Sequence, residues 1–164
     1  MPAVDDPRLA DALDHGEIDR LQRAYADALN RRAWDDLEAL FHPDAVVDLD
    51  LVTRPSHRLE GPAGVSAFIA AAMDRFTFFQ FVILNSHVTL HLDGDPDRAR
   101  ARVYMCELRQ LAGEAERNDA FGLYQDTYRR GDDGWKIAQR SYRSMARFPP
   151  GEVFGLPPVQ DAQP

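Results

Sequence analysis

Cysteine is almost missing from this chain of 164 residues, which contains only Cys106. One cysteine forms neither an internal disulfide nor a cysteine-based zinc site, so nothing here implies an oxidising compartment. The chain also lacks an excess of positive charge, because 27 Asp and Glu residues outnumber 19 Lys and Arg residues and give a net charge of -8. That sign is wrong for attracting a phosphate backbone, which argues against nucleic acid as a partner.

Long apolar runs are absent too. The N-terminal stretch "MPAVDDPRLADALDH" is acidic and has no apolar targeting segment. No run approaches the roughly 20 apolar residues of a membrane span. We therefore expect a cytoplasmic protein that does not contact membranes. With 45% hydrophobic residues, the length suits one domain with its own core.

Helical patterns dominate the first part of the chain. Asp6 as an N-cap and Pro7 at the first helical position indicate a short leading helix, which Gly16 is expected to interrupt. From Glu17 onward, apolar residues recur at spacings of three and four, which is typical of a helix with one buried stripe. That stripe consists of Ile18, Leu21, Tyr25 and Leu29.

Three more elements are expected before the middle of the chain. "RRAWDDLEALF" indicates a short helix that ends before Pro43, and "AVVDLDL" alternates as a strand does. "GPAGVSAFIAAAM" indicates a third helix. Its inward face is expected to consist of Val65, Phe68, Ile69 and Met73.

The chain after Thr77 predicts an antiparallel meander of four long strands. β-branched and aromatic runs are separated by the turn signals "DGDPD", "AGEAERN" and "GDDG". Helices followed by strands favour an α+β fold with the helices on one face of a single sheet. The proline-rich segment from Pro149 predicts an extended arm or disordered end. We therefore divide the chain into an N-terminal arm or short helix (1–15), one domain (16–148) and a C-terminal tail (149–164).

Glu107 is the least ordinary residue of the predicted sheet. Alternate residues of a strand face opposite sides, and Glu107 continues a face that is otherwise apolar. The apolar members of that face are Ala99, Ala101, Val103 and Met105. A carboxylate there is costly unless it is paired or used. Either Glu107 enters the interior, or the face leaves the core at that point and Glu107 pairs with a neighbouring arginine at the surface.

The histidines give a weaker signal. Val88 and Leu90 share one face of their strand, so alternation places His87 on the other face, away from the core. A β-bulge near Asn85 and Ser86 would reverse that orientation. None of the other histidines shows the spacing with an acid that a zinc site needs. These are His15, His42, His57 and His91.

Three strings carry a resemblance to a known family: "YADALNRRAWDDLEALFHPDAVVDL", the helix of residues 61–73, and "YQDTYRRGDDGWKIAQR". Together they resemble the SnoaL-like branch of the NTF2-like superfamily, which includes polyketide cyclases, scytalone dehydratase, bile-acid dehydratase and hexachlorocyclohexane dehydrochlorinase. The resemblance implies a cone, in which a curved antiparallel sheet wraps around three N-terminal helices and encloses an apolar pocket. It also implies a homodimer or homotrimer.

The resemblance assigns candidate site residues. Dehydratase-like members use a tyrosine, an aspartate and a histidine, and these positions fall on Tyr25, on Asn30 and near His87. A further acid of some members falls on Glu107, and a frequent arginine falls on Arg140. Asn30 can hold an imidazole but cannot supply the charge that makes it a strong base; in serine proteases the equivalent Asp-to-Asn change costs roughly 10⁴ in turnover.

We expect a small cofactor-independent enzyme, a dehydratase, isomerase or cyclase, that removes a proton beside a carbonyl of a hydrophobic cyclic or polyketide-like substrate. Tyr25 would polarise the carbonyl, Glu107 or His87 would transfer the proton, and Arg140 would position the substrate. The candidate pocket walls are Phe41, Phe68, Met73, Val103 and Met105.

A non-catalytic ligand-binding or assembly module is the alternative. Convergence of Tyr25, Glu107 and an imidazole in one cavity would favour the enzyme, because proton transfer needs hydrogen-bond reach. No glycine-rich loop follows a predicted strand, so we expect no nucleotide or flavin site, no metal site and no cofactor.

Overall fold

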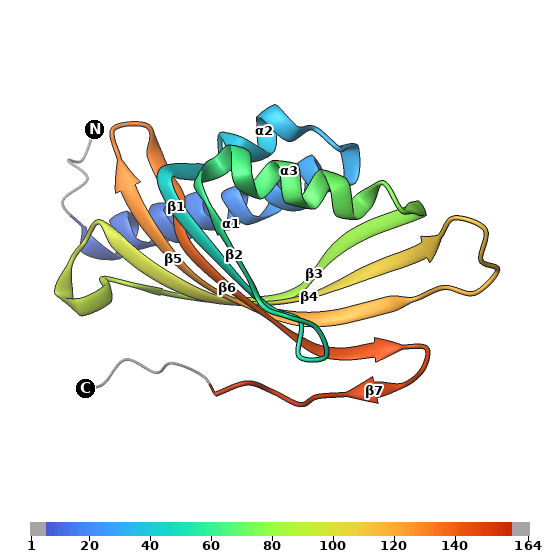
Figure 1. Cartoon of the computed structure of the whole chain (residues 1–164). Helices are drawn as coiled ribbons and strands as arrows, with labels where there is room; N and C mark the ends of the chain where they lie inside the picture. Colours follow the sequence, from blue (N-terminus) through green and yellow to red (C-terminus); the bar gives the residue numbers. More distant parts are fainter. Residues whose placement is uncertain (1–5, 159–164) are drawn as a thin grey trace.

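The computed structural model describes residues 6–158, with the helices gathered on one face of a curved sheet (Figure 1). The three α-helices are α1 (Pro7–Arg31), α2 (Trp34–Glu38) and α3 (Gly61–Met73), and a short 3-10 helix, η1, spans Leu92–Gly94. Within this range, no helix combines the length and apolar character needed to cross a membrane.

Helix α1 is longer than expected. Asp6 caps it as predicted, since its carboxylate accepts a hydrogen bond of 3.0 Å from the Arg8 backbone N–H. The expected interruption at Gly16 is wrong, because the helix is continuous through that residue. A glycine inside a helix costs only about 1 kcal/mol relative to alanine. Burial of the predicted apolar stripe outweighs that cost, because each of its four side chains is at most 7% exposed.

Within residues 6–158, one seven-stranded sheet contains every strand, and these are β1 (Phe41–Asp50), β2 (His57–Glu60), β3 (Phe76–Leu90), β4 (Arg98–Leu111), β5 (Asp119–Gly131), β6 (Gly134–Phe148) and β7 (Glu152–Val153). The main order is β2-β1-β6-β5-β4-β3, so the predicted four-strand meander is confirmed. The expected all-antiparallel pairing is wrong at one place, because β1 and β6 run parallel. Helix α3 connects β2 to β3, and the meander from β3 to β6 follows. Its last strand, β6, pairs with the edge of β1 that does not pair with β2, and the two strands run in the same direction.

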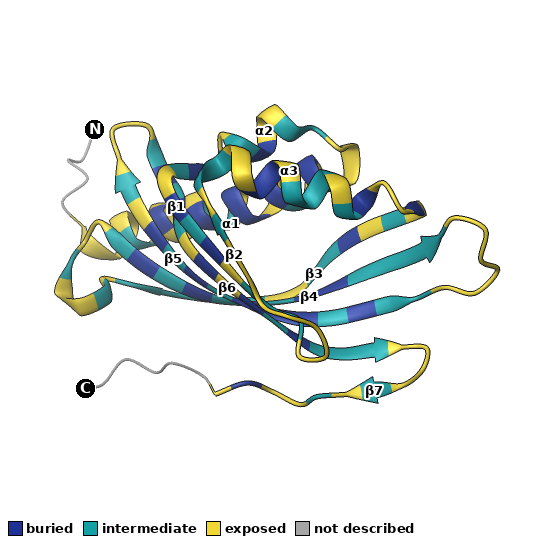
Figure 2. Ribbon diagram, viewed as in Figure 1, coloured by how far each residue is buried: buried dark blue, intermediate teal, exposed yellow. Residues whose placement is uncertain are grey.

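The core lies between the helices and the sheet. Buried and less buried residues alternate along β4 from Arg98 to Met105 and along parts of β5, as expected for strands with one face toward the helices (Figure 2). Val103 and Met105 on β4 are at most 1% exposed and belong to this core, together with Ile18 of α1 and Val65 of α3.

A β-bulge occurs in β3, but it does not change the direction of His87. The register of β3 with β4 shifts between Ile83 and Asn85, so Leu84 is an extra residue close to the expected bulge. The bulge reverses the phase of the strand and turns Ile83 toward the core. His87 pairs with Arg102 and remains on the outer face of the sheet, as simple alternation predicts.

The segment after Pro149 turns back along the sheet. Strand β7 pairs with the end of β6, and the Phe154 backbone N–H donates a 2.8 Å hydrogen bond to the Met145 carbonyl. The described part of the tail is therefore an extended arm. The remaining tail residues, 159–164, and residues 1–5 of the predicted N-terminal segment lie outside the described residues.

Candidate functional site

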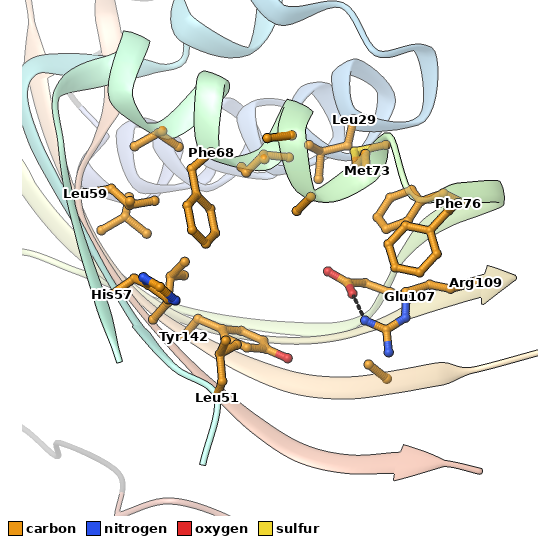
Figure 3. A pocket seen from close by; sticks show the side chains of 18 of the residues that line it. Leu29, Leu51, His57, Leu59, Phe68, Met73, Phe76, Glu107, Arg109 and Tyr142 are labelled. Atoms are coloured by element: carbon orange, nitrogen blue, oxygen red, sulfur yellow. Dashed lines mark hydrogen bonds and ion pairs between the residues drawn. The ribbon is translucent and has the colours of Figure 1, made fainter. Parts of the chain in front are cut away.

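A cavity of about 510 Å³ opens between the sheet and helices α1 and α3. This volume lies in the range of roughly 300–1,000 Å³ that is typical of small-molecule sites. Most of its wall is apolar, and the side chains in Figure 3 converge on it from both layers. Of the predicted wall residues, Phe41, Phe68 and Met73 line the cavity. Val103 and Met105 do not line it, because they are packed in the core.

Glu107 reaches the cavity from β4, one step beyond the buried part of its face. Its carboxylate accepts a 3.0 Å hydrogen bond from Nη1 of Arg109, which also lines the cavity. Burial raises the pKa of Glu107 above the ordinary value near 4.5, although the Arg109 charge and hydrogen bond act in the opposite direction. Glu107 is thus both directed into the cavity and paired with an arginine there, rather than at the outer surface.

A buried ion pair forms another part of the wall, in which Arg140 lines the cavity and Asp126 lies behind it. Arg140 donates two hydrogen bonds to Asp126, of 2.8 Å from Nε and 2.6 Å from Nη2, and the two side chains are 3% and 0% exposed. Tyr128 donates to Asp126 at 2.7 Å, and Gln22 donates to the Tyr128 hydroxyl at 3.1 Å. Burial lowers the pKa of Arg140, but the charge of Asp126 more than offsets this, so the guanidinium stays charged.

Two tyrosines contact the guanidinium of Arg140 through their rings. The Cζ atom of Arg140 lies 4.2 Å from the ring centroid of Tyr25 and 4.0 Å from that of Tyr124, which are cation–π distances. All three residues line the cavity. Burial raises the pKa of both tyrosines above the usual value near 10, so they are neutral hydroxyl donors at neutral pH.

Tyr142 adds a third tyrosine to the wall. Burial raises its pKa to about 12. Its ring lies against Gly122 of the neighbouring strand, where an added Cβ would come within 2.2 Å of the ring atom Cε2. Glycine at position 122 therefore makes room for the ring of Tyr142.

Asn30 does not line the cavity, and both ends of its side chain bind the backbone of Phe81 on β3. The side-chain amide donates to the Phe81 carbonyl at 3.1 Å, and the side-chain oxygen accepts from the Phe81 N–H at 2.7 Å. An ionised aspartate could accept the second bond but could not donate the first. This explains the amide at position 30. Its bonds are not local to the helix end but connect α1 to the sheet.

His57, rather than His87, is the imidazole of the cavity. His87 lies on the outer face of the sheet and borders a separate depression of about 230 Å³. His57 begins β2, lines the cavity, and lies with its ring centroid 5.0 Å from that of Phe68. Figure 3 shows His57 and Glu107 on opposite sides of the cavity, with Tyr142 between them. Tyr25, Glu107 and an imidazole therefore line one cavity, although the imidazole differs from the predicted one.

Sequence reasoning missed several lining residues. Arg109 follows Glu107 by two positions, so continuing the alternation by one step would have identified it. Tyr124 and Tyr142 pair across β5 and β6, and the same alternation places both on the inner face. For His57, the available signal was its alternation with Leu59, which also lines the cavity.

Comparisons with known proteins agree with this architecture. The sequence model described as "SnoaL-like domain" matches residues 10–141. The protein Rv2910c of Mycobacterium tuberculosis, itself uncharacterized, is 28% identical over 133 residues, which cover 80% of this chain and 86% of Rv2910c.

Solved structures share the fold at low identity. A Novosphingobium aromaticivorans protein provisionally named as a scytalone dehydratase is 18% identical, with a TM-score of 0.72 over 93% of this chain and 97% of that chain. Hexachlorocyclohexane dehydrochlorinase LinA-type3 from Novosphingobium barchaimii is 16% identical, with a TM-score of 0.75 over 92% and 99%. An NTF2-like protein from N. aromaticivorans is 22% identical, with a TM-score of 0.66 over 85% and 90%. The chain belongs to the SnoaL-like domain family and has the α+β NTF2-like fold.

Proposed function

We propose that this protein is a small acid–base enzyme, a lyase or isomerase, that acts on a hydrophobic cyclic or polyketide-like substrate. One observation carries the proposal: the Glu107 carboxylate faces an apolar cavity of about 510 Å³, and burial raises its pKa toward the range in which a general base works best. The names of two solved relatives, a dehydratase and a dehydrochlorinase, denote eliminations and support this reaction class.

The first step would be removal of a proton from the carbon beside a carbonyl. The proton moves to Glu107, and the electron pair of the broken C–H bond moves onto the carbonyl oxygen as an enolate. A donor must stabilise the negative charge that develops on that oxygen. Tyr25 and Tyr124 are the neutral hydroxyl groups of the wall, and the Arg140 guanidinium between them adds a fixed positive charge.

Collapse of the enolate would complete either of two reactions. In an elimination the electron pair returns and expels a leaving group from the next carbon, whereas in an isomerisation a proton is added at another carbon. His57 faces the cavity from the side opposite Glu107 and is the group we assign to protonate the departing oxygen. This division gives the base and the acid separate walls of the cavity.

The uncharged compound 5-nitrobenzisoxazole tests the role of Glu107. A base removes its C3 proton, the electrons of that C–H bond form the nitrile, and the N–O bond breaks to give a coloured phenolate. We expect the protein to accelerate this reaction and the rate to rise with pH as Glu107 loses its proton, with a midpoint above 4.5. Glu107→Gln should reduce the rate by about 10²–10⁴, the usual contribution of a general base.

Glu114→Gln is the matched control, because Glu114 is exposed in the loop between β4 and β5. It should leave the rate unchanged. Circular dichroism and a melting curve would show whether each variant is folded. A folded Glu107→Gln variant with the wild-type rate would contradict the proposal.

The alternative is a binding module without chemistry, and one observation favours it. The side chain of Asn30, at the position where dehydratase-like relatives are expected to carry an aspartate, is occupied by the backbone of β3. A protein that binds 5-nitrobenzisoxazole without turnover would support this alternative. We also propose a homodimer or homotrimer, which light scattering of the purified protein tests directly.

A further inference from the structure

The charge of the cavity wall is opposite to that of the whole chain. The chain has a net charge of -8. Among the described residues that line the cavity, Glu107 is the only carboxylate, whereas five are arginines. The five are Arg54, Arg75, Arg109, Arg140 and Arg147. A wall of this composition attracts anions into a protein whose overall charge repels them.

Two of the five arginines form ion pairs: Arg109 pairs with Glu107, and Arg140 pairs with Asp126. The other three form no ion pair within residues 6–158. Arg147 donates to the Thr53 hydroxyl and to the Leu51 carbonyl, each at 2.7 Å. Arg75 donates to the Ala72 carbonyl at 3.3 Å. Arg54 has no hydrogen-bond partner within the described part of the chain. Neutral oxygens accept these hydrogen bonds, so none of the three arginines has a described carboxylate in direct contact, although the charge of Arg147 also acts on Glu107 and lowers its pKa.

Arg147 connects two parts of the cavity wall, because it is in register with Glu107 through Ala120 and also contacts the loop that carries Arg54. The two hydrogen bonds from Arg147 hold the loop between β1 and β2 against the end of β6. That loop brings Leu51 and Arg54 to the cavity wall, and His57 follows directly. Arg54 and His57 line the cavity and are also exposed to solvent, so they stand at its opening. We call Arg54 and Arg147 the arginine rim.

We propose that the substrate carries a carboxylate on its hydrophobic ring system, and that the arginine rim binds this carboxylate while the ring enters the apolar cavity. The inference deepens the proposed function, because it rests on that function for the orientation of the ring toward Glu107. Glu107 does not oppose the anion, since its charge is compensated by Arg109. Each guanidinium has five N–H donors, so Arg147 keeps three after its two loop contacts. Charge-assisted hydrogen bonds of this kind are the strong ones.

A pair of ligands with the same shape tests the proposal. 2-Naphthoate and 2-naphthamide have the same ring system, but only the first is an anion. Isothermal titration at low ionic strength should give about tenfold tighter binding of 2-naphthoate, as one charge-assisted contact in a partly desolvated site provides. Raising the salt concentration should weaken the binding of 2-naphthoate and leave that of 2-naphthamide unchanged.

Arg54→Gln removes a rim charge without breaking a hydrogen bond of the structure. We expect it to reduce the preference for 2-naphthoate by at least threefold, and the affinity for 2-naphthamide to stay within twofold. Arg147→Lys keeps the charge but changes the loop contacts, and it should retain most of the preference. Arg23→Gln, which removes an exposed arginine of α1 outside the cavity, should leave the preference unchanged.

Equal affinities of the wild-type protein for the two naphthalenes would overturn the proposal, as would a preference that Arg54→Gln does not reduce. Absence of 2-naphthoate binding would overturn it too. The proposed function fails by a different result, because 5-nitrobenzisoxazole is uncharged and its turnover depends on Glu107. If the protein prefers 2-naphthoate but turns over 5-nitrobenzisoxazole independently of Glu107, the arginine rim is supported and the role of Glu107 as the base is contradicted.

Discussion

The buried pair of Arg140 and Asp126 gives the sharpest test of how the site is held together. Asp126→Asn keeps the size of the side chain and removes its charge, so the guanidinium of Arg140 stays buried at 3% exposure without a counter-ion. Removing one partner of a buried ion pair costs about 3–5 kcal/mol. A chain of this size loses about 2–4 °C of melting temperature per kcal/mol, so we expect a fall of roughly 6–20 °C.

Urea unfolding followed by circular dichroism measures this cost. The control is Asp48→Asn, which breaks the exposed pair with Arg58, whose side chains are 54% and 59% exposed. That pair should contribute less than about 1 kcal/mol. The double variant Asp126→Leu/Arg140→Met replaces both charges with apolar groups and should recover much of the lost stability, because no unpaired charge remains.

Two results would refute this reasoning. If Asp126→Asn is no more destabilising than Asp48→Asn, the buried pair does not hold Arg140 in place. If the double variant is as unstable as Asp126→Asn alone, the loss arises from packing around Asp126 and not from the unpaired charge of Arg140. The comparison of the three free energies of unfolding separates these cases.

Two further predictions concern Asn30 and Glu107. Asn30→Asp removes the donor to the Phe81 carbonyl, so it should lower the free energy of unfolding in urea by about 0.5–1.5 kcal/mol, the net contribution of one hydrogen bond; an unchanged value would mean that this bond does not anchor β3. The folded-state pKa of Glu107 lies above its unfolded value near 4.5, so the folded protein binds more protons between these two pKa values. Stability should therefore fall as the pH rises through that window, and Glu107→Gln should show a smaller fall in the same series of melting curves; identical pH dependence of the two proteins would contradict the raised pKa.

Most of the fold follows from local signals in the sequence. Asp6 and Pro7 mark the start of α1, and the alternation of apolar residues identifies the four strands of the meander because each is long. The parallel pairing of β1 with β6 does not follow, since register between distant strands depends on contacts that no local pattern contains. Strand β2 was missed for another reason, because a strand of four residues is too short for alternation to stand out.

Site residues on long strands without bulges could be predicted from the sequence, whereas those near a bulge or on a short strand could not. Glu107 was found because β4 alternates from Arg98 to Met105 and pairs with β5 without a bulge as far as Glu107. His87 was chosen as the imidazole nearest to the family position, which falls at residues 83–86, but its side chain lies on the outer face of the sheet. His57 belongs to a short edge strand after a loop, so its direction depends on how Arg147 holds that loop. Its place in the cavity is therefore a property of the tertiary structure.

Asn30 and Glu107 are connected through one strand pair, which gives the amide at position 30 a role in the proposed chemistry. Asn30 binds the backbone of Phe81 with both ends of its side chain, and Phe81 pairs with Glu107 in the register of β3 and β4. A carboxylate at position 30 would lose one of these bonds. The same chain carries its carboxylate directly across the strand pair, facing the cavity. If Glu107 is the base, helix α1 contributes to catalysis not by supplying a charge but by fixing the strand beside the residue that does.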